Sequence, residues 1–264
     1  MSNQKESSNL SRFFAGIVII LALVVGHLIF YLVLGDPGNF DAEGHPKEGN
    51  ILGVMYKGGF IVPILLALLI TVITIGIERF ITLQKAKGNG SIEMFVRKLK
   101  GLLASGKIDE AIKECDRQQG SLANVMRCGL ETYKDVHNDK TYDHAAKEAA
   151  VQKELEEATS LELPMLGKNL PILSTAASIG TLIGLIGTVV GMIRAFAALA
   201  VAGQPDTAAL ATGISEALVN TMVGIIASTF AIIFYNMFST RIDQLTYSMD
   251  EAGFSIMQTL KSKG

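Results

Sequence analysis

The stretch that decides the fold is LPILSTAASIGTLIGLIGTVVGMIRAFAALAVAG (170–203), in which no residue between Lys168 and Arg194 carries a charge. The twenty-five residues between those two charges would extend roughly 37 Å as an α-helix. A bilayer's hydrocarbon core is about 30 Å thick, so this helix can cross a membrane with length left to tilt or protrude. The run therefore predicts an all-α integral membrane protein.

Three other apolar runs are also predicted to span a membrane. Phe13–Leu34 holds 22 residues and is too long for the apolar part of a cleaved signal peptide. A second run covers Phe60–Ile77, and a last one begins near Gly213. The predicted organisation is a tail and extra span (1–34), a periplasmic loop (35–58), a second span (59–83), a cytoplasmic helical domain (84–168), a third span (169–203), a periplasmic turn (204–212), a fourth span (213–240) and a cytoplasmic tail (241–264).

The basic residues predict which side of the membrane each loop occupies. The segments 35–58 and 201–212 together hold two Lys and no Arg, whereas residues 84–168 and the C-terminal tail hold most of the rest. Loops rich in Lys and Arg remain inside the cell. Both termini and residues 84–168 are therefore expected in the cytoplasm of a bacterial cell, with the four spans in its inner membrane.

Composition excludes several classes of function. The net charge of −2 indicates no nucleic-acid partner, and the spacing of Cys115 and Cys128 fits neither a zinc site nor a redox pair. We expect both to be reduced, packed thiols. The chain shows no grouping typical of a catalytic triad, zinc protease or P-loop, and the glycine-rich 180–187 lies inside a predicted span. No enzyme activity, metal or cofactor is therefore expected.

The last two spans carry small and polar residues at intervals of three or four, which places them on one face of each helix. In the third span these are Ser174, Ser178, Thr181, Gly184, Thr188, Gly191 and Ala195, and in the fourth Ala217, Thr221, Gly224, Ser228 and Ala231. Such stripes commonly mean only that helices pack closely in lipid. Thr188 and Thr221, however, are predicted at similar depth near mid-membrane, where both hydroxyls could face one cavity.

Glu216 and Arg194 are the charged residues of these spans. A carboxylate at the membrane boundary is costly and usually functional, but Glu216 also lies in the first turn of its predicted helix, where an acid is favoured. Both interpretations remain open from sequence alone. Asn220 continues a polar arc from Glu216, and Arg194 is expected to extend to the lipid headgroups.

Two blocks of the chain, GLIGTVVGMIRAF (184–196) and ISEALVNTMVGIIAS (214–228), followed by IIFYN (232–236), resemble the MotA/TolQ/ExbB proton-channel family. Residues 106–130 are similar to its cytoplasmic helices, and within the family the motifs are most similar to the ExbB branch. The sequence differs from the family's usual pattern at Thr181, Val190 and Phe230 and in its extra N-terminal span.

The resemblance implies a homo-oligomer, a pentamer in this family, which encloses a dimer of an ExbD-like single-span partner. The partner's membrane aspartate would carry protons inward, and a TonB-like protein would transmit the resulting force to outer-membrane transport. By the same resemblance Thr188, Thr221 and Glu216 would line the proton pathway. The residues expected on the pore face or in close helix packing are Ser178, Thr181, Gly184, Gly187, Gly191, Asn220, Gly224 and Ser228.

Other functions fit the sequence less fully. A TolQ-like or MotA-like stator of the same family stays open. A non-conducting helical scaffold would explain the small-residue stripes but not Glu216 together with two threonines at similar depth. A secondary transporter would need internal repeats or broken helices, and neither is found.

Overall fold

The computed structural model describes residues 2–137, 143–200 and 207–261, and within them it is all-α apart from short turns and one isolated β-bridge, Phe40 with Pro46. Four stretches of helix are long and apolar enough to cross a membrane, which confirms the predicted fold class. These lie within Phe14–Leu34, Gly59–Ala104, His144–Leu199 and Thr207–Lys261.

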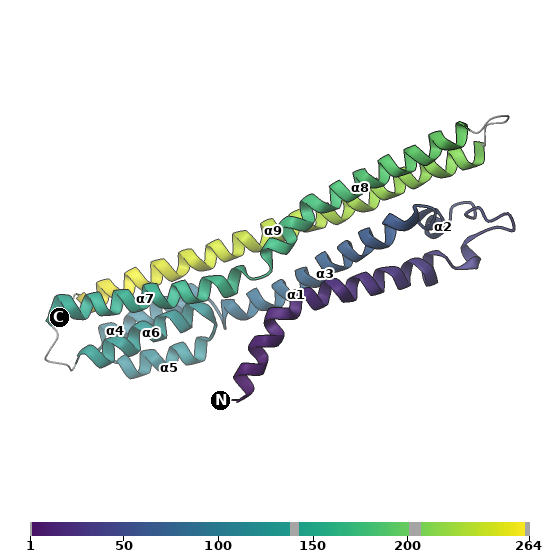
Figure 1. The fold of residues 1–264 in the computed structure, drawn as a ribbon. Helices are drawn as coiled ribbons and strands as arrows, with labels where there is room; N and C mark the ends of the chain where they lie inside the picture. The colour runs from purple at the N-terminus through teal and green to yellow at the C-terminus, as the bar shows by residue number, and fades with distance from the viewer. Residues whose placement is uncertain (1, 138–142, 201–206, 262–264) are drawn as a thin grey trace. The chain divides into compact units, whose positions relative to one another are not determined.

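The chain divides into two compact units (Figure 1). The first, called the span unit, comprises the described residues of Met1–Ile77 and Asn169–Asn236. The second, called the bundle unit, comprises those of Glu78–Lys168 and Met237–Gly264. Helices α3 (Val62–Lys87) and α9 (Thr207–Lys261) each contribute residues to both units.

In the span unit, α1 (Ser2–Leu28) continues into the π-helical turn η1 (Ile29–Leu34). Gly26 lets α1 approach α3 closely, since a Cβ there would lie 2.7 Å from the Pro63 carbonyl oxygen. η1, η3 (Gly59–Ile61) and the start of α3 meet α9 in one apolar cluster, formed by Phe30, Leu34, Ile61, Val62, Leu65, Val219 and Val223. The additional first span is thus packed into the unit's core.

The segment predicted as a loop, 35–58, contains more structure than expected. It holds the 3-10 turn η2 (Pro37–Asn39) and the helix α2 (Ile51–Tyr56), and the 3-10 turn η3 (Gly59–Ile61) follows. Asn50 caps α2 by accepting a hydrogen bond from Gly53 N at 3.1 Å. Tyr56 stacks on Phe30 with ring centroids 4.7 Å apart, so apolar contacts offset the turn-forming composition.

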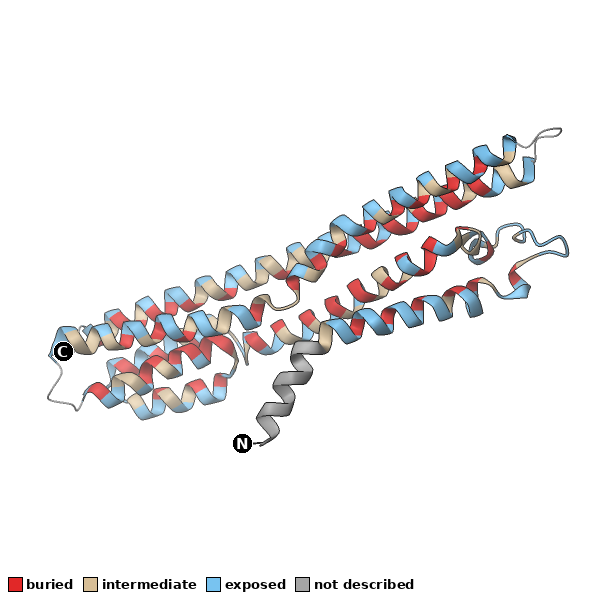
Figure 2. Ribbon diagram, viewed as in Figure 1, coloured by how far each residue is buried: buried red, intermediate tan, exposed pale blue. Residues whose placement is uncertain are grey.

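Helices α8 (Leu170–Leu199) and α9 form the hairpin that carries the candidate site. Figure 2 shows buried residues along the line where the two helices face each other. The contact is backbone on backbone: a Cβ on Gly224 would lie 2.5 Å from Gly180 O, and one on Gly191 would lie 2.7 Å from Gly213 O. Because no hydrophobic force draws helices together in lipid, the van der Waals contacts made at such close approach stabilise the hairpin.

The observed hairpin corrects one predicted boundary and shows which residues of the predicted stripe are buried. First, α9 begins at Thr207 rather than near Gly213, so 207–212 is helical and not part of a turn. The sequence TAALAT holds good helix formers, which explains the earlier start; residues 201–206 lie outside the described part. Second, Gly184, Gly191 and Ala195 of the predicted stripe are buried together with Gly180 and Gly187, whereas its hydroxyl residues Ser174, Ser178 and Thr181 are exposed. The buried stripe of α8 is therefore rotated about the helix axis relative to the exposed hydroxyl residues.

The bundle unit packs α4 (Ile92–Ala104), α5 (Ile108–Gln118), α6 (Gly120–His137) and α7 (His144–Gly167) with the C-terminal part of α9. Helices α4 and α5 are joined by a short turn at Gly106. Each helix buries one apolar face, and the most buried side chains include Leu99, Leu103, Leu122, Met126, Leu130, Met249 and Ile256. α9 continues to Lys261, so the predicted polar tail is helical.

Substituting Gly224 with Ala should destabilise the chain by about 1–3 kcal/mol, because the added methyl group must separate α8 from α9. Thermal unfolding of the purified chain in detergent would measure this. Gly101→Ala is the matched control, since nothing lies within 4 Å of a Cβ added there, and it should stabilise α4 by about 0.5–1 kcal/mol. Equal effects of the two changes would contradict the close-packed hairpin.

The two thiols should differ in reactivity. Burial, followed by the neighbouring Asp116 charge, raises the pKa of the Cys115 thiol to about 12. Burial also raises the pKa of Cys128, whose side chain is less buried. Iodoacetamide should therefore alkylate Cys128 first and reach Cys115 only when the bundle unfolds, because the thiolate is the nucleophile. Peptide mass spectrometry after timed alkylation would test this, and fast labelling of Cys115 in the folded Cys128→Ser variant would disprove it.

Candidate functional site

Thr188 on α8 and Thr221 on α9 meet across the hairpin through a hydrogen bond between their hydroxyl oxygens, in which either can donate. Both side chains are half-buried. Backbone carbonyls provide further acceptors: Thr188 Oγ1 lies 3.2 Å from Gly184 O, and Thr221 Oγ1 lies 3.2 Å from Ala217 O. Each hydroxyl has one hydrogen and two lone pairs. While one hydroxyl donates to the other, the second can donate to a carbonyl and still accept.

A second pair of hydroxyls lies farther along the same hairpin. Thr181 Oγ1 donates to Ser228 Oγ at 2.9 Å. Thr181 and Thr188, like Thr221 and Ser228, are seven residues apart, which corresponds to a rise of roughly 10 Å along each helix. We call the four side chains the hydroxyl ladder. Sequence spacing placed all four on candidate faces, but it did not reveal that Thr181 and Ser228 form a pair.

Gly180 and Gly187 make room for polar side chains of α9. A Cβ on Gly180 would lie 2.6 Å from Ser228 Oγ, and one on Gly187 would lie 2.4 Å from the Asn220 Cβ. Gly184, by contrast, faces the backbone of Asn220 and Gly224. Of the residues predicted for pore face or packing, the glycines, Asn220 and Ser228 are buried in the helix contact, while Ser178 and Thr181 are exposed.

Glu216 does not join the ladder. It lies five residues before Thr221, which turns it about 140° around the axis of α9. Its carboxylate is buried and accepts a hydrogen bond from Arg194 Nη1 at 2.5 Å. Arg194, which was expected to extend to the headgroups, pairs with Glu216, and its guanidinium lies over the Phe60 ring, 5.5 Å from the centroid. Within this chain the Glu216 carboxylate and the two threonine hydroxyls form separate hydrogen-bonded pairs.

Asn220 follows Glu216 on the face of α9 that meets the start of η3. The residue is fully buried, and its Nδ2 donates to Gly58 O at 3.0 Å. Its Oδ1 has no hydrogen-bond partner among the described residues. The predicted polar arc of Glu216 and Asn220 thus contacts the chain that leads into α3, and not the hydroxyl ladder.

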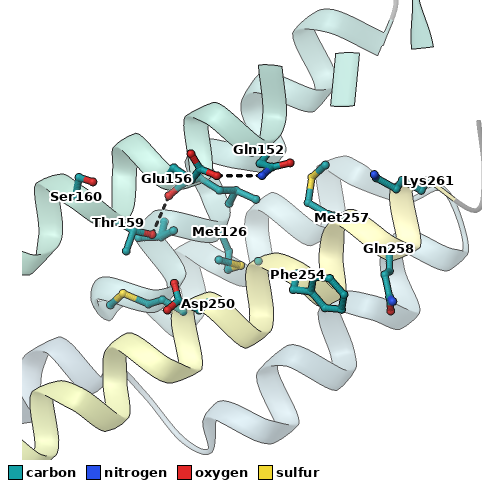
Figure 3. A pocket seen from close by; sticks show the side chains of 14 residues that line it. Met126, Gln152, Glu156, Thr159, Ser160, Asp250, Phe254, Met257, Gln258 and Lys261 are labelled. Atoms are coloured by element: carbon teal, nitrogen blue, oxygen red, sulfur yellow. Dashed lines mark hydrogen bonds between the residues drawn. The ribbon is translucent and has the colours of Figure 1, made fainter. Parts of the chain in front are cut away.

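The bundle unit contains a separate groove of about 810 Å³ between α6, α7 and the end of α9 (Figure 3). Met126, Leu155 and Met257 line it, together with polar side chains, two of which bond within their own helix. Gln152 Nε2 donates to Glu156 at 3.0 Å, and Thr159 Oγ1 donates to Leu155 O at 2.8 Å. This lining fits helix packing, whereas the ladder brings hydroxyls from two spans together. We therefore take the ladder as the candidate site.

The fold and the ladder define a class: a helical membrane protein whose last two spans form a glycine-packed hairpin with a polar face. A family model described as the MotA/TolQ/ExbB proton channel family matches residues 117–251, a little over half of the chain. The chain belongs to this family. The match includes the whole ladder as well as Arg194, Glu216 and Asn220.

Two curated relatives are both named Tol-Pal system protein TolQ. The protein from Pseudomonas aeruginosa is 34% identical over 136 residues, which is 49% of this chain and 59% of the relative. The protein from Haemophilus influenzae is 27% identical over 202 residues, covering 75% of this chain and 88% of the relative. The chain thus matches less than two thirds of the first relative's length and most of the second's.

The pairing of Thr181 with Ser228 can be tested by a double-mutant cycle. Each change to Ala should cost little alone, and the pair should show a coupling of about 0.5–1.5 kcal/mol, the usual size of a hydrogen bond between membrane helices. Unfolding midpoints in detergent provide the measurement. Thr229→Ala is the control, because Thr229 bonds only to Ile225 O in its own helix. Additive effects of Thr181→Ala and Ser228→Ala would show that the hydrogen bond between the two hydroxyls contributes nothing to stability.

Proposed function

We propose that this chain is the channel-forming subunit of a proton-driven stator in the bacterial inner membrane. The observation that carries the proposal is the Thr188–Thr221 hydroxyl pair between the last two spans. In the proposed assembly the ladder side of the hairpin faces the membrane helix of a single-span, ExbD-like partner. That partner's aspartate takes up and releases protons beside the two hydroxyls, and the proton motive force drives the motion.

Hydroxyls suit this role because they interact with both states of a carboxyl group. A threonine can donate to a carboxylate and accept from the protonated acid. It adds no fixed charge that would hold the partner in one position. Membrane interiors penalise unpaired charge heavily, so a neutral polar pair lets a proton-carrying aspartate pass at low cost.

The proposed assembly is suggested by the half-buried state of the Thr188–Thr221 pair. Exposed apolar residues surround it on both helices, among them Leu185, Val189 and Ile225. A ring of copies, a pentamer by family resemblance, would cover such surfaces with neighbouring chains and lipid, and would direct the ladders toward a central partner dimer. In this arrangement both termini and residues 84–168 lie in the cytoplasm, as the positive-inside rule predicts.

Which cellular process the proposed motor drives depends on the branch of the family to which the chain belongs. The sequence motifs suggested an ExbB-like subunit that serves TonB-dependent outer-membrane transport. Both relatives reported above carry the TolQ name, which favours the Tol-Pal branch of the same proposal. Expressing the chain in cells that lack TolQ and in cells that lack ExbB would separate the two, since rescue of one defect identifies the branch.

Proton flux should depend on the two threonine hydroxyls. With the chain and a single-span partner reconstituted in vesicles, Thr188→Ala combined with Thr221→Ala should lower proton uptake about tenfold or more, a size typical for loss of a proton-transfer group. A pH-sensitive dye trapped in the vesicles would measure the uptake. Thr188→Ser combined with Thr221→Ser should keep the flux, because serine retains the hydroxyl.

The competing function is a non-conducting scaffold built from the same small-residue stripes. A wild-type complex that conducts no protons, together with full activity in cells from the double alanine variant, would favour that scaffold. Thr229→Ala controls for general effects of losing a membrane hydroxyl. Native mass spectrometry of the co-purified complex counts both subunits, and it separates a loss of flux from a loss of assembly.

A further inference from the structure

Arg194 and Glu216 form an ion pair that joins three segments of the span unit. Arg194 lies near the end of α8, Glu216 lies in α9, and both reach the chain at Gly59, where η3 begins. A Cβ built on Gly59 would lie 2.3 Å from Glu216 Oε1 and 3.5 Å from Arg194 Nη1. The carboxylate therefore rests directly against the backbone at Gly59.

Gly59 meets two separate demands at this contact. Its φ of 76° lies in the left-handed region, where a residue with a side chain is strained. In addition, any side chain there would collide with the Glu216 carboxylate. The backbone turn and the ion pair thus require the same residue, which ties the start of η3 to α9.

Two further contacts hold the same short segment. Asn220, one turn after Glu216, donates to Gly58 O, and the Arg194 guanidinium lies over the Phe60 ring. Residues 58–60 are thereby bound through a hydrogen bond, a close backbone contact and a cation–π contact. We call Arg194, Glu216 and Asn220, with residues 58–60, the clamp.

The two charged side chains of the clamp differ strongly in exposure. The Glu216 side chain is 5% exposed, and that of Arg194 is 51% exposed. A buried carboxylate without its cation is severely destabilising, because little else offsets its lost hydration. Arg194, by contrast, can turn to solvent or headgroups if Glu216 is neutral. The pair is therefore asymmetric: the buried Glu216 carboxylate depends on Arg194 for its stability far more than the half-exposed Arg194 depends on Glu216.

We infer that Arg194 and Glu216 act as a charge-neutral clamp that fixes the start of α3 to the α8–α9 hairpin. Glu216 is in this inference a positioning residue and not a carrier of protons. Its carboxylate is engaged by Arg194 on a face of α9 turned about 140° from Thr221. The part concerning protons rests on the proposed function, whereas the clamp itself does not.

The asymmetry makes the inference testable with three variants of the full chain. Arg194→Gln should lower the thermal unfolding midpoint by roughly 6 °C or more, the shift expected when a buried charge loses its partner. Glu216→Gln should lower it less, and the double variant Arg194→Gln with Glu216→Gln should return above the Arg194→Gln value. Lys153→Gln is the matched control, since Lys153 belongs to an exposed ion pair with Glu157.

Proton flux of the same variants separates a clamp from a carrier. A clamp predicts that Arg194→Gln loses more flux than Glu216→Gln, and that adding Glu216→Gln to Arg194→Gln restores it. A carrier predicts the opposite order, with no flux in either variant that lacks the carboxylate. That opposite result would overturn the positioning role.

The stability cycle stands apart from the flux assay. If the wild-type chain conducts no protons with its partner, the proposed function fails, yet the unfolding midpoints still test the clamp. Additive midpoint changes, or Glu216→Gln being the more damaging single variant, would overturn the clamp. The Arg194→Gln variant could be too unstable to accumulate in membranes. In that case, accumulation of the double variant supports the clamp, and absence of both variants from the membrane refutes it.

Discussion

Backbone contact between α8 and α9 is the constraint on which the span unit depends. At Gly180, Gly191, Gly213 and Gly224 the two helices approach so closely that a methyl group would meet backbone atoms of the other helix. This distance lets the short hydroxyls of Thr188 and Thr221 reach each other and lets Thr181 reach Ser228. Larger residues at those glycines would leave each hydroxyl bonded only to its own helix.

The same close packing separates two kinds of polar chemistry on α9. One face presents neutral hydroxyls, and another presents Glu216 and Asn220 to α8 and to the chain entering α3. A formal charge is tolerated in the apolar unit where a second charge lies within hydrogen-bond distance. The neutral ladder needs no such compensation. Under the proposed function this division keeps fixed charge away from the path of a moving proton.

The additional first span affects this arrangement through α3. Phe30 and Leu34, at the end of the first helical stretch, share an apolar cluster with Val62 of α3 and with Val219 and Val223 of α9. Val219 directly precedes Asn220 and Val223 follows it by three residues, so the cluster and the clamp hold adjacent parts of the α3–α9 contact. Apolar packing and the ion pair thus act on the same junction.

The sequence by itself determined the class of the protein, its four long apolar stretches and the similar depth of Thr188 and Thr221. Long uncharged runs favour a membrane helix, and the spacing of residues on a helix predicts their face and depth. It also identified the family, through the motif blocks around Thr188 and Thr221. These are local properties, set by residue type and helical period.

Only the tertiary structure decided which face of each helix meets its neighbour. A small-residue stripe is compatible with several rotations of α8, and the actual one buries Gly180 and Gly187 while it leaves Ser178 and Thr181 exposed. The partner of Glu216 was likewise hidden from the sequence. Arg194 precedes it by 22 residues, and their contact exists because the hairpin, together with the backbone at Gly59, brings a cation to a buried carboxylate.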